Sequence, residues 1–273
     1  MDDLDRYAEA VRQALPAFYR PLEVLASVPS TMGRGAELAA AGAPEGATVV
    51  ADQQAEGRGR LGRAWLAPPG SSLLVTVLLR PAITREEAWL VVAAAGVALA
   101  EAVDLLAPSP LDAGLKWPND LELRGRKAAG LLAEAHLNGA NPDWVLLGMG
   151  VNVTQGAGDL PPEVAGRATS VTLAAGTPID RATLLGAWGE RFLAGYRRLA
   201  GGQPGALLAA YRQRLLTIGR RVRAERVGAE PVVGTAVDLT DAGALVVQTD
   251  GGARVPVLAA DVQHLLPEPP GTA

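Results

Sequence analysis

Residues 57–65 read Gly-Arg-Gly-Arg-Leu-Gly-Arg-Ala-Trp and combine residue types that bind phosphate or carboxylate groups. Arg58, Arg60 and Arg63 supply planar, permanently charged groups that match the oxygens of such anions. The glycines let the backbone approach a ligand closely, and Trp65 offers a flat face for a nucleobase. The segment contains neither the Gly-Lys-Ser/Thr of a P-loop nor the dinucleotide fingerprint. We predict a mobile loop that closes over the phosphates of a nucleotide; a basic surface linker is the alternative.

Two polar segments precede this loop. Ser30-Thr31 stands before a helical stretch, so its hydroxyls either bind a ligand or cap that helix. Gln54 ends an expected strand, where its amide can donate and accept hydrogen bonds at once. That property suits a urea or carboxamide ligand, although a glutamine at a strand end can also be a plain surface residue.

Three further segments follow the loop. Lys116-Trp-Pro-Asn-Asp120 can hold a cation and a phosphate together, or it can form only a hairpin turn. Lys127 begins an apolar strand, where a lysine is either paired or extends to water. Asn152 lies within the apolar run 148–153 and needs a hydrogen-bond partner if it is buried.

The elements that must position these residues follow from periodicity and capping signals. Strands are expected at 48–51, 72–79, 127–135 and 144–153, and as a pair around a turn within 115–123. Helices are expected at the start of the chain, at 180–199, at 204–216, and from the capping box Thr84-Arg-Glu-Glu87 to about Leu106. After residue 217, short alternating segments with turns at 241–243 and 250–252 predict a small β-barrel. We expect domains at 1–216 and 217–266, and a disordered tail at 267–273.

Composition excludes several classes of function. The net charge of −4 argues against a dominant nucleic-acid surface. The absence of cysteine excludes disulfides and thiolate metal sites. The acidic N-terminus has no signal-peptide pattern, and the apolar run 88–100 is too short to cross a bilayer. We therefore expect a cytoplasmic protein that binds neither membrane nor nucleic acid.

In this order, the arginine loop, Lys-Trp-Pro-Asn-Asp, Lys-Xaa-Xaa-Gly-Leu-Leu-Xaa-Glu and Gly-Xaa-Gly-Xaa-Asn-Val resemble the signature series of biotin protein ligases. The resemblance covers about residues 28–266. It implies an α+β fold, with a mixed β-sheet flanked by helices as in class II aminoacyl-tRNA synthetases, followed by an SH3-like β-barrel. About 27 residues precede the pattern, so the chain resembles the monofunctional type without an N-terminal DNA-binding domain.

The resemblance also implies a reaction. These enzymes join biotin to ATP, giving biotinyl-5′-AMP and pyrophosphate, and then transfer biotin to a lysine of a biotin carboxyl carrier protein, a subunit of acetyl-CoA carboxylase. Mg²⁺ is expected with ATP, its ligands cannot be named, and a homodimer is possible. Lipoate–protein ligase, which has a related catalytic domain, is one alternative. A DNA-binding repressor or a non-catalytic adenylate sensor is another.

Roles follow from the resemblance residue by residue. The catalytic residues would be Lys127, which contacts the biotin carboxylate and α-phosphate, Arg60, and Asp120, which accepts or positions the acceptor lysine's proton. The ureido ring would bind Ser30, Thr31 and Gln54. The complete predicted substrate-binding set is Ser30, Thr31, Gln54, Gly57, Arg58, Gly59, Arg60, Arg63, Trp65, Lys116, Asn119, Lys127, Gly130 and Asn152.

Three departures from the family pattern stand out. Met32 replaces an asparagine of many relatives, Leu61 replaces an arginine, and 128–129 is Ala-Ala. We expect Leu61 to affect how tightly the adenylate is retained.

Overall fold

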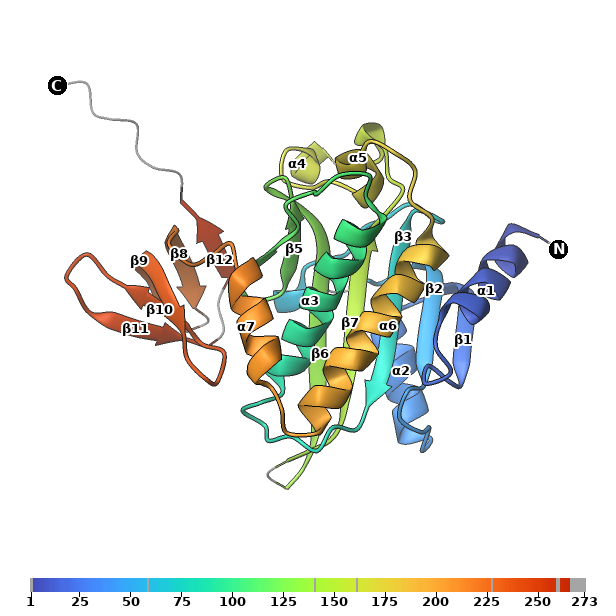
Figure 1. Cartoon of the computed structure of the whole chain (residues 1–273), viewed down its shortest axis with the longest axis horizontal. Coiled ribbons are helices and arrows are strands. Elements are labelled where there is room, and N and C mark those ends of the chain that lie inside the picture. Colours follow the sequence, from blue (N-terminus) through green and yellow to red (C-terminus); the bar gives the residue numbers. More distant parts are fainter. Residues whose placement is uncertain are drawn as a thin grey trace.

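The computed structural model of the chain describes residues 2–57, 59–139, 141–160, 162–226, 228–258 and 261–265, and of Leu61 only the backbone. Within these ranges the strands form two sheets. One has seven strands in the order β1-β2-β3-β7-β6-β5-β4, and the other has five in the order β11-β10-β9-β8-β12. Figure 1 shows the second sheet at one end of the molecule, beside α7.

The larger sheet contains one parallel pair, β1 with β2, and its other neighbouring pairs are antiparallel. Its strands are β1 (Leu22–Val28), β2 (Thr48–Gln54), β3 (Ser72–Leu79), β4 (Gly114–Lys116), β5 (Asp120–Leu123), β6 (Arg126–Asn138) and β7 (Asn141–Asn152). The helices are α1 (Asp3–Ala14), α2 (Thr31–Ala40), α3 (Trp89–Leu106), α4 (Pro162–Ala165), α5 (Val171–Ala175), α6 (Arg181–Ala200) and α7 (Gly205–Arg214).

One face of this sheet forms the main hydrophobic core. Alternate residues of the central strands, such as Val75, Val151 and Ala129, are buried against α3 and α6, which cross the sheet in Figure 1. α3 is long and apolar enough to cross a membrane by length and composition, yet 67% of it is buried inside the fold. We interpret it as the core helix that the apolar run 88–100 predicts.

The opposite face is covered only in part. α2 packs on it through a small cluster that includes Ala39, Leu78 and Leu146. Next to α2 the same face presents Gly130 paired with Gly150. Gly148, two residues earlier on β7, lies beneath α2, since a Cβ added there would be 2.6 Å from Met32 Sδ. These glycines lack side chains, so together they form a shallow floor on which Met32 and the loop after β2 can lie.

The smaller sheet is joined to the larger one by specific hydrogen bonds. It comprises β8 (Arg221–Arg226), β9 (Ala229–Leu239), β10 (Leu245–Gln248), β11 (Arg254–Val257) and β12 (Asp261–His264). Trp117 Nε1 donates to Gly243 O (2.9 Å) in the loop between β9 and β10, and Trp117 N donates to Thr217 Oγ1 (3.0 Å) on the segment that leads into β8. The Lys-Trp-Pro-Asn-Asp turn is therefore anchored to the C-terminal sheet.

The α+β class with a mixed sheet flanked by helices is confirmed, and so is an antiparallel C-terminal sheet. Two local expectations differ from the structure. Thr84 and Glu87 form their reciprocal capping bonds, but α3 begins only at Trp89, because residues 85–88 form turns. β1 and β12 are strands that the sequence patterns did not predict. The SH3-like closure of the C-terminal sheet stays a prediction, and the predicted tail 267–273 lies outside the described residues.

Candidate active site

The arginine loop folds back on itself. Trp65 N donates to Gly57 O (2.9 Å), and Gly59 N donates to Arg63 O (2.7 Å). Between them Arg60–Gly62 forms one turn of 3-10 helix, and Gly62 takes a φ of +71°, which glycine adopts without strain. The loop thus presents Arg60 and Arg63 from a single tight turn, while Arg58 lies outside the described residues.

Trp65 carries the end of this loop onto the glycine floor. A Cβ atom added at Gly150 would lie 2.8 Å from Trp65 Cε2, and one added at Gly130 would lie 3.3 Å from Trp65 Cζ3. The indole can approach the sheet this closely only because these positions lack side chains. Among the described residues no acceptor reaches the buried Trp65 Nε1. The indole therefore covers the floor without a polar contact that would have to break when a ligand displaces it.

The polar cluster beneath the start of α2 orients one amide. Gln54 Oε1 accepts hydrogen bonds from Thr31 N (2.7 Å) and Thr31 Oγ1 (3.0 Å). Thr76 Oγ1 donates to Thr31 Oγ1 (2.9 Å), and both threonines are buried. With its oxygen held in this way, the amide turns Nε2 toward the arginine loop, 3.1 Å from where a Cβ of Gly57 would be. Ser30 precedes α2 and makes no side-chain capping bond in the described structure.

A row of charged side chains borders the other end of the floor. The register pairs Asp120 with both Lys116 and Gly130, and Glu122 with Lys127, so these side chains share the open face. Lys127 Nζ donates to Asp120 Oδ1 (2.7 Å) and lies 5.9 Å from the centroid of the Trp65 ring. Lys116 Nζ lies 3.8 Å from Glu122 Oε1, and burial raises the pKa of Glu122.

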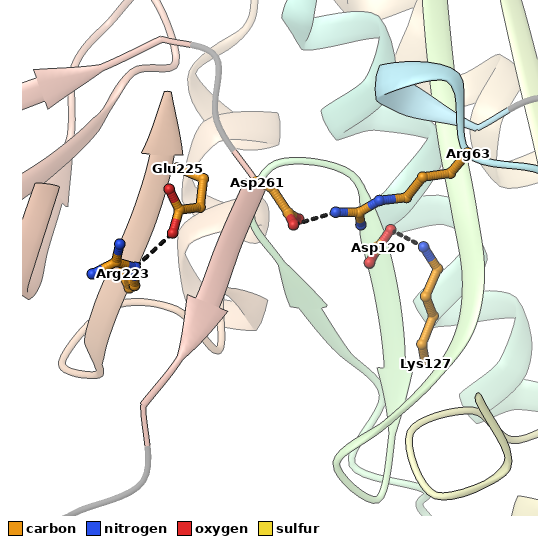
Figure 2. A network of polar contacts seen from close by, with 6 residues as sticks. All are labelled: Arg63, Asp120, Lys127, Arg223, Glu225 and Asp261. Atoms are coloured by element: carbon orange, nitrogen blue, oxygen red, sulfur yellow. Dashed lines mark hydrogen bonds and ion pairs between the residues drawn. The ribbon is translucent and has the colours of Figure 1, made fainter. Parts of the chain in front are cut away.

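Figure 2 shows the side chain of Arg63 directed at Asp261, next to the pair of Asp120 and Lys127. Arg63 forms an ion pair with Asp261 of β12, so the loop bridges to the C-terminal sheet. Burial lowers the pKa of the Arg60 guanidinium, and the negative charges of Asp120 and Asp261 oppose that shift. Asp261 stands directly opposite Glu225, which pairs with Arg223 at 2.5 Å. Because like charges opposite each other destabilise a sheet, the pairing of Asp261 with Arg63 favours the closed loop.

We predict that Asp261→Asn loosens the loop before any ligand binds. An exposed ion pair contributes up to about 1 kcal/mol, so trypsin should cut after Arg60 or Arg63 about two to five times faster than in the wild type. Limited proteolysis without ligand measures this rate. Glu225→Gln is the matched control, because it removes one charge of the cross-strand pair and leaves Arg63 bound to Asp261. Equal cleavage of both variants would refute the bridge.

Two predicted ligand contacts have their amides engaged with the protein. Asn119 Nδ2 donates to Leu131 O (2.6 Å), which ties the turn to β6. Asn152 Nδ2 donates to Thr169 O (3.1 Å), and Asn152 Oδ1 accepts from Gln155 Nε2 (3.2 Å). Each of these two side chains therefore binds a backbone carbonyl of the protein, that of Leu131 or that of Thr169.

His264 of β12 is linked to the turn at 116–120 through Thr217. Its Nε2 lies 3.2 Å from Thr217 Oγ1, which accepts from Trp117 N (3.0 Å). Burial, with the positive charges of Lys116 and Arg220, lowers the pKa of His264 to about 4. Between this value and its ordinary value of 6.5 the unfolded chain binds a proton that the folded chain does not. The stability contributed by neutral His264 is therefore complete above about pH 6.5 and is lost as the pH falls toward 4.

We predict that His264→Gln flattens this pH dependence. Thermal unfolding followed by circular dichroism should show a drop in Tm from about pH 7 to about pH 4.5 that is several degrees smaller in the variant than in the wild type. His136→Gln is the control, since His136 is exposed and stacks on Trp144 away from this interface. Parallel curves for all three proteins would contradict the assignment.

Comparison with known proteins decides the family. A biotin–[acetyl-CoA-carboxylase] ligase from Mycobacterium tuberculosis is 40% identical to this chain over 250 residues, which are 90% of each protein. The chain belongs to the biotin protein ligase family. In this biotin protein ligase, residues 24–152 match the Biotin/lipoate A/B protein ligase family, and residues 217–265 match the Biotin protein ligase C terminal domain.

Two further comparisons agree. A bifunctional ligase/repressor from Bacillus subtilis is 34% identical over 236 residues, 86% of this ligase and 71% of that protein. The solved biotin protein ligase from Aquifex aeolicus in complex with biotin and ATP is 27% identical, with a TM-score of 0.76, over 90% of this chain and all of that one.

The structure brings most predicted site residues of the ligase onto one face. Arg60, Trp65 and Gly130 meet the charged row of Lys116, Asp120 and Lys127, while Ser30, Thr31 and Gln54 gather at the start of α2. Sequence reasoning did not list Gly148, Gly150, Thr76 or Asp261. Gly148 and Gly150 stand two residues apart, so on a strand they leave the same face without side chains; this spacing could have revealed the floor. Nothing local to Asp261 signals its contact with a residue 198 positions away.

Proposed function

We propose that this chain is an ATP-dependent ligase that activates biotin as biotinyl-5′-AMP and transfers it to a specific lysine of a biotin carboxyl carrier protein. One observation carries the proposal: a glycine floor, covered by the movable side chain of Trp65, lies between an amide cluster and a charged row that contains Lys116 and Lys127. The amide of Gln54 suits a ureido ring, and the cations suit a carboxylate and phosphates. The 40% identity to the M. tuberculosis ligase supports the same reaction.

In the first step a biotin carboxylate oxygen attacks the α-phosphorus of ATP, a new P–O bond forms, and the bond to the leaving pyrophosphate breaks. This step needs no protein nucleophile, but it brings anions together. We propose that the Lys127 ammonium contacts the carboxylate and the α-phosphate, and that Arg60 and Arg63 contact the phosphates. Preorganised cations in a partly buried site stabilise charge that develops in the transition state.

In the second step the amine of the carrier lysine attacks the carbonyl carbon of the mixed anhydride, and AMP leaves with the bonding electrons. The acceptor must reach this carbon as a neutral amine. We propose that Asp120, which accepts from Lys127 at 2.7 Å, takes or positions the proton that the amine loses. A cavity of about 480 Å³ beside Arg60 and Asn119, between Trp89, Trp117 and the C-terminal sheet, offers the carrier an approach.

Mg²⁺ is proposed to enter as part of the nucleotide substrate. In the part of the chain that the structure describes, no group of three or more histidines, aspartates or glutamates could hold a metal ion. Asp120 and Glu122 are each paired with a lysine. These residues do not fit a resident metal site, whereas Mg²⁺ commonly binds through substrate phosphates and water.

We further propose that residues 1–216 form the biotin- and ATP-binding domain, and that 217–266 form the C-terminal domain with an SH3-like closure. The protein would act in the cytoplasm, where its nucleotide and carrier substrates are available. A net charge of −4 supports small molecules and a protein, rather than nucleic acid, as partners.

Transfer of labelled biotin to a purified carrier domain, with ATP and Mg²⁺, tests the function. We expect labelling that depends on ATP and is absent with labelled lipoate. Since the matching family includes lipoate ligases, a thermal-shift comparison of the two acids provides the second measurement. Stabilisation by lipoate without stabilisation by biotin would overturn the proposal.

A further inference from the structure

The main chain of Lys127 is held by a segment outside the seven strands. β7 ends at Asn152, and its last partner on β6 is Ala129, so β7 does not reach Lys127. Residues 167–169, between α4 and α5, take its place. Lys127 N donates to Arg167 O (2.8 Å), and Thr169 N donates to Lys127 O (2.8 Å). Both backbone groups of the lysine are thus bound by one short segment.

This segment is itself fixed by buried amides. Thr169 O accepts from Asn152 Nδ2 (3.1 Å), and Asn152 Oδ1 accepts from Gln155 Nε2 (3.2 Å). Gln155 Nε2 also donates to Ser72 Oγ (2.6 Å) of β3. The hydroxyl of Ser170 donates to Gln155 O (2.6 Å). A continuous chain of hydrogen bonds therefore runs from β3 through Gln155 and Asn152 to Thr169 and the backbone of Lys127.

Gln155 is poorly suited to a purely stabilising role. Gln155 is buried, with only 1% of the residue exposed. Within the described residues no donor reaches its buried Oε1. A buried acceptor without a partner costs stability, whereas an apolar residue of the same shape would avoid that cost. The amide instead fixes the positions of two strands relative to each other, because its Nε2 donates both to Ser72 Oγ of β3 and to Asn152 Oδ1 of β7.

We propose that Gln155 and Asn152 are positioning residues for Lys127, acting through residues 167–169. The inference rests on the catalytic role proposed for Lys127. The Lys127 side chain reaches the floor from a backbone that this chain of bonds holds, and Asp120 orients its tip. A small displacement of a catalytic group lowers the rate strongly even when ligand binding persists. The expected signature is a loss of kcat with KM almost unchanged.

Gln155→Met tests the proposal, since methionine fills a similar volume without the amide. We expect kcat for biotin-dependent ATP–pyrophosphate exchange to fall about tenfold, with KM for biotin and ATP within about twofold of the wild-type values. Hydrogen–deuterium exchange should be faster in the peptides containing the Lys127 and Thr169 amides. Thr48→Val is the control, because Thr48 is fully buried and donates to Gly46 O (2.8 Å) outside this network. It should lower stability without lowering kcat.

Ser72→Ala provides a milder second variant that removes one acceptor of Gln155. We expect a smaller fall in kcat and the same exchange pattern, and this variant decides the matter if Gln155→Met does not fold. Wild-type kcat in a folded variant, or unchanged amide exchange at Lys127, would overturn the proposal. Failure of the proposed function gives a different result. The wild type itself would then show no biotin-dependent ATP–pyrophosphate exchange, while deuterium exchange would still report whether residues 167–169 hold the backbone of Lys127.

Discussion

Lys127→Ala is expected to lower biotin-dependent ATP–pyrophosphate exchange by about two to three orders of magnitude. The ammonium lies where the floor meets the charged row, at 2.7 Å from Asp120 Oδ1 and 5.9 Å from the Trp65 ring centroid. Without it, the charge that develops at the α-phosphorus loses a preorganised partner, and Asp120 adds an unpaired negative charge beside it. Both effects act on the transition state.

Biotin affinity should fall much less than the rate in this variant, because the contact of Lys127 with the carboxylate is lost but the polar cluster of Thr31 and Gln54, at the other end of the floor, is intact. Isothermal titration with biotin alone separates binding from chemistry. Arg126→Ala is the matched control, since it removes a neighbouring but exposed positive charge on the same strand. Wild-type exchange by Lys127→Ala, in a folded protein that binds biotin, would remove the lysine from the mechanism and leave Arg60 and Arg63 as the main cations.

Gly150→Val should weaken biotin binding strongly while leaving the fold as stable as the wild type, or slightly more stable. Gly150 lies within β7 and does not adopt a positive φ, and a β-branched residue suits a strand better than glycine. Its Cβ would nevertheless stand 2.8 Å from Trp65 Cε2, in the space where the ligand is proposed to lie. Trp65 belongs to a loop and can move aside, but the floor would remain filled.

The measurement pairs a thermal melt with titration of biotin. We expect an unchanged or higher Tm, together with at least about a hundredfold weaker binding, the scale of about 3 kcal/mol. Ala135→Val controls for the added volume, because Ala135 is exposed on β6. Tight biotin binding by Gly150→Val would show that the ligand does not use this floor.

Local patterns in the chain were sufficient to predict much of the fold. The apolar run at 72–79 predicts β3 with its observed bounds, and Asp180 accepts from Thr183 N (2.8 Å) as the expected cap of α6. Such signals are readable because the burial of a strand and the satisfaction of helix ends act over a few residues. β1 was missed because its residues are half-buried at a sheet edge, where the pattern of exposure is irregular.

The residues of the candidate site were likewise predicted from the sequence only in part. Residue types and spacing within single segments determined the candidate cations, the amide Gln54 and the family. Only the tertiary structure decided that Gly130, Gly148 and Gly150 make one floor beneath Trp65 and Met32, that Arg63 meets Asp261, and that residues 167–169 hold Lys127. The physical reason is that strand register and domain packing set these contacts between distant segments, and no local periodicity records them. Asn152 is the clearest case: its sequence demanded a partner, and only the fold shows that the partners are Thr169 and Gln155.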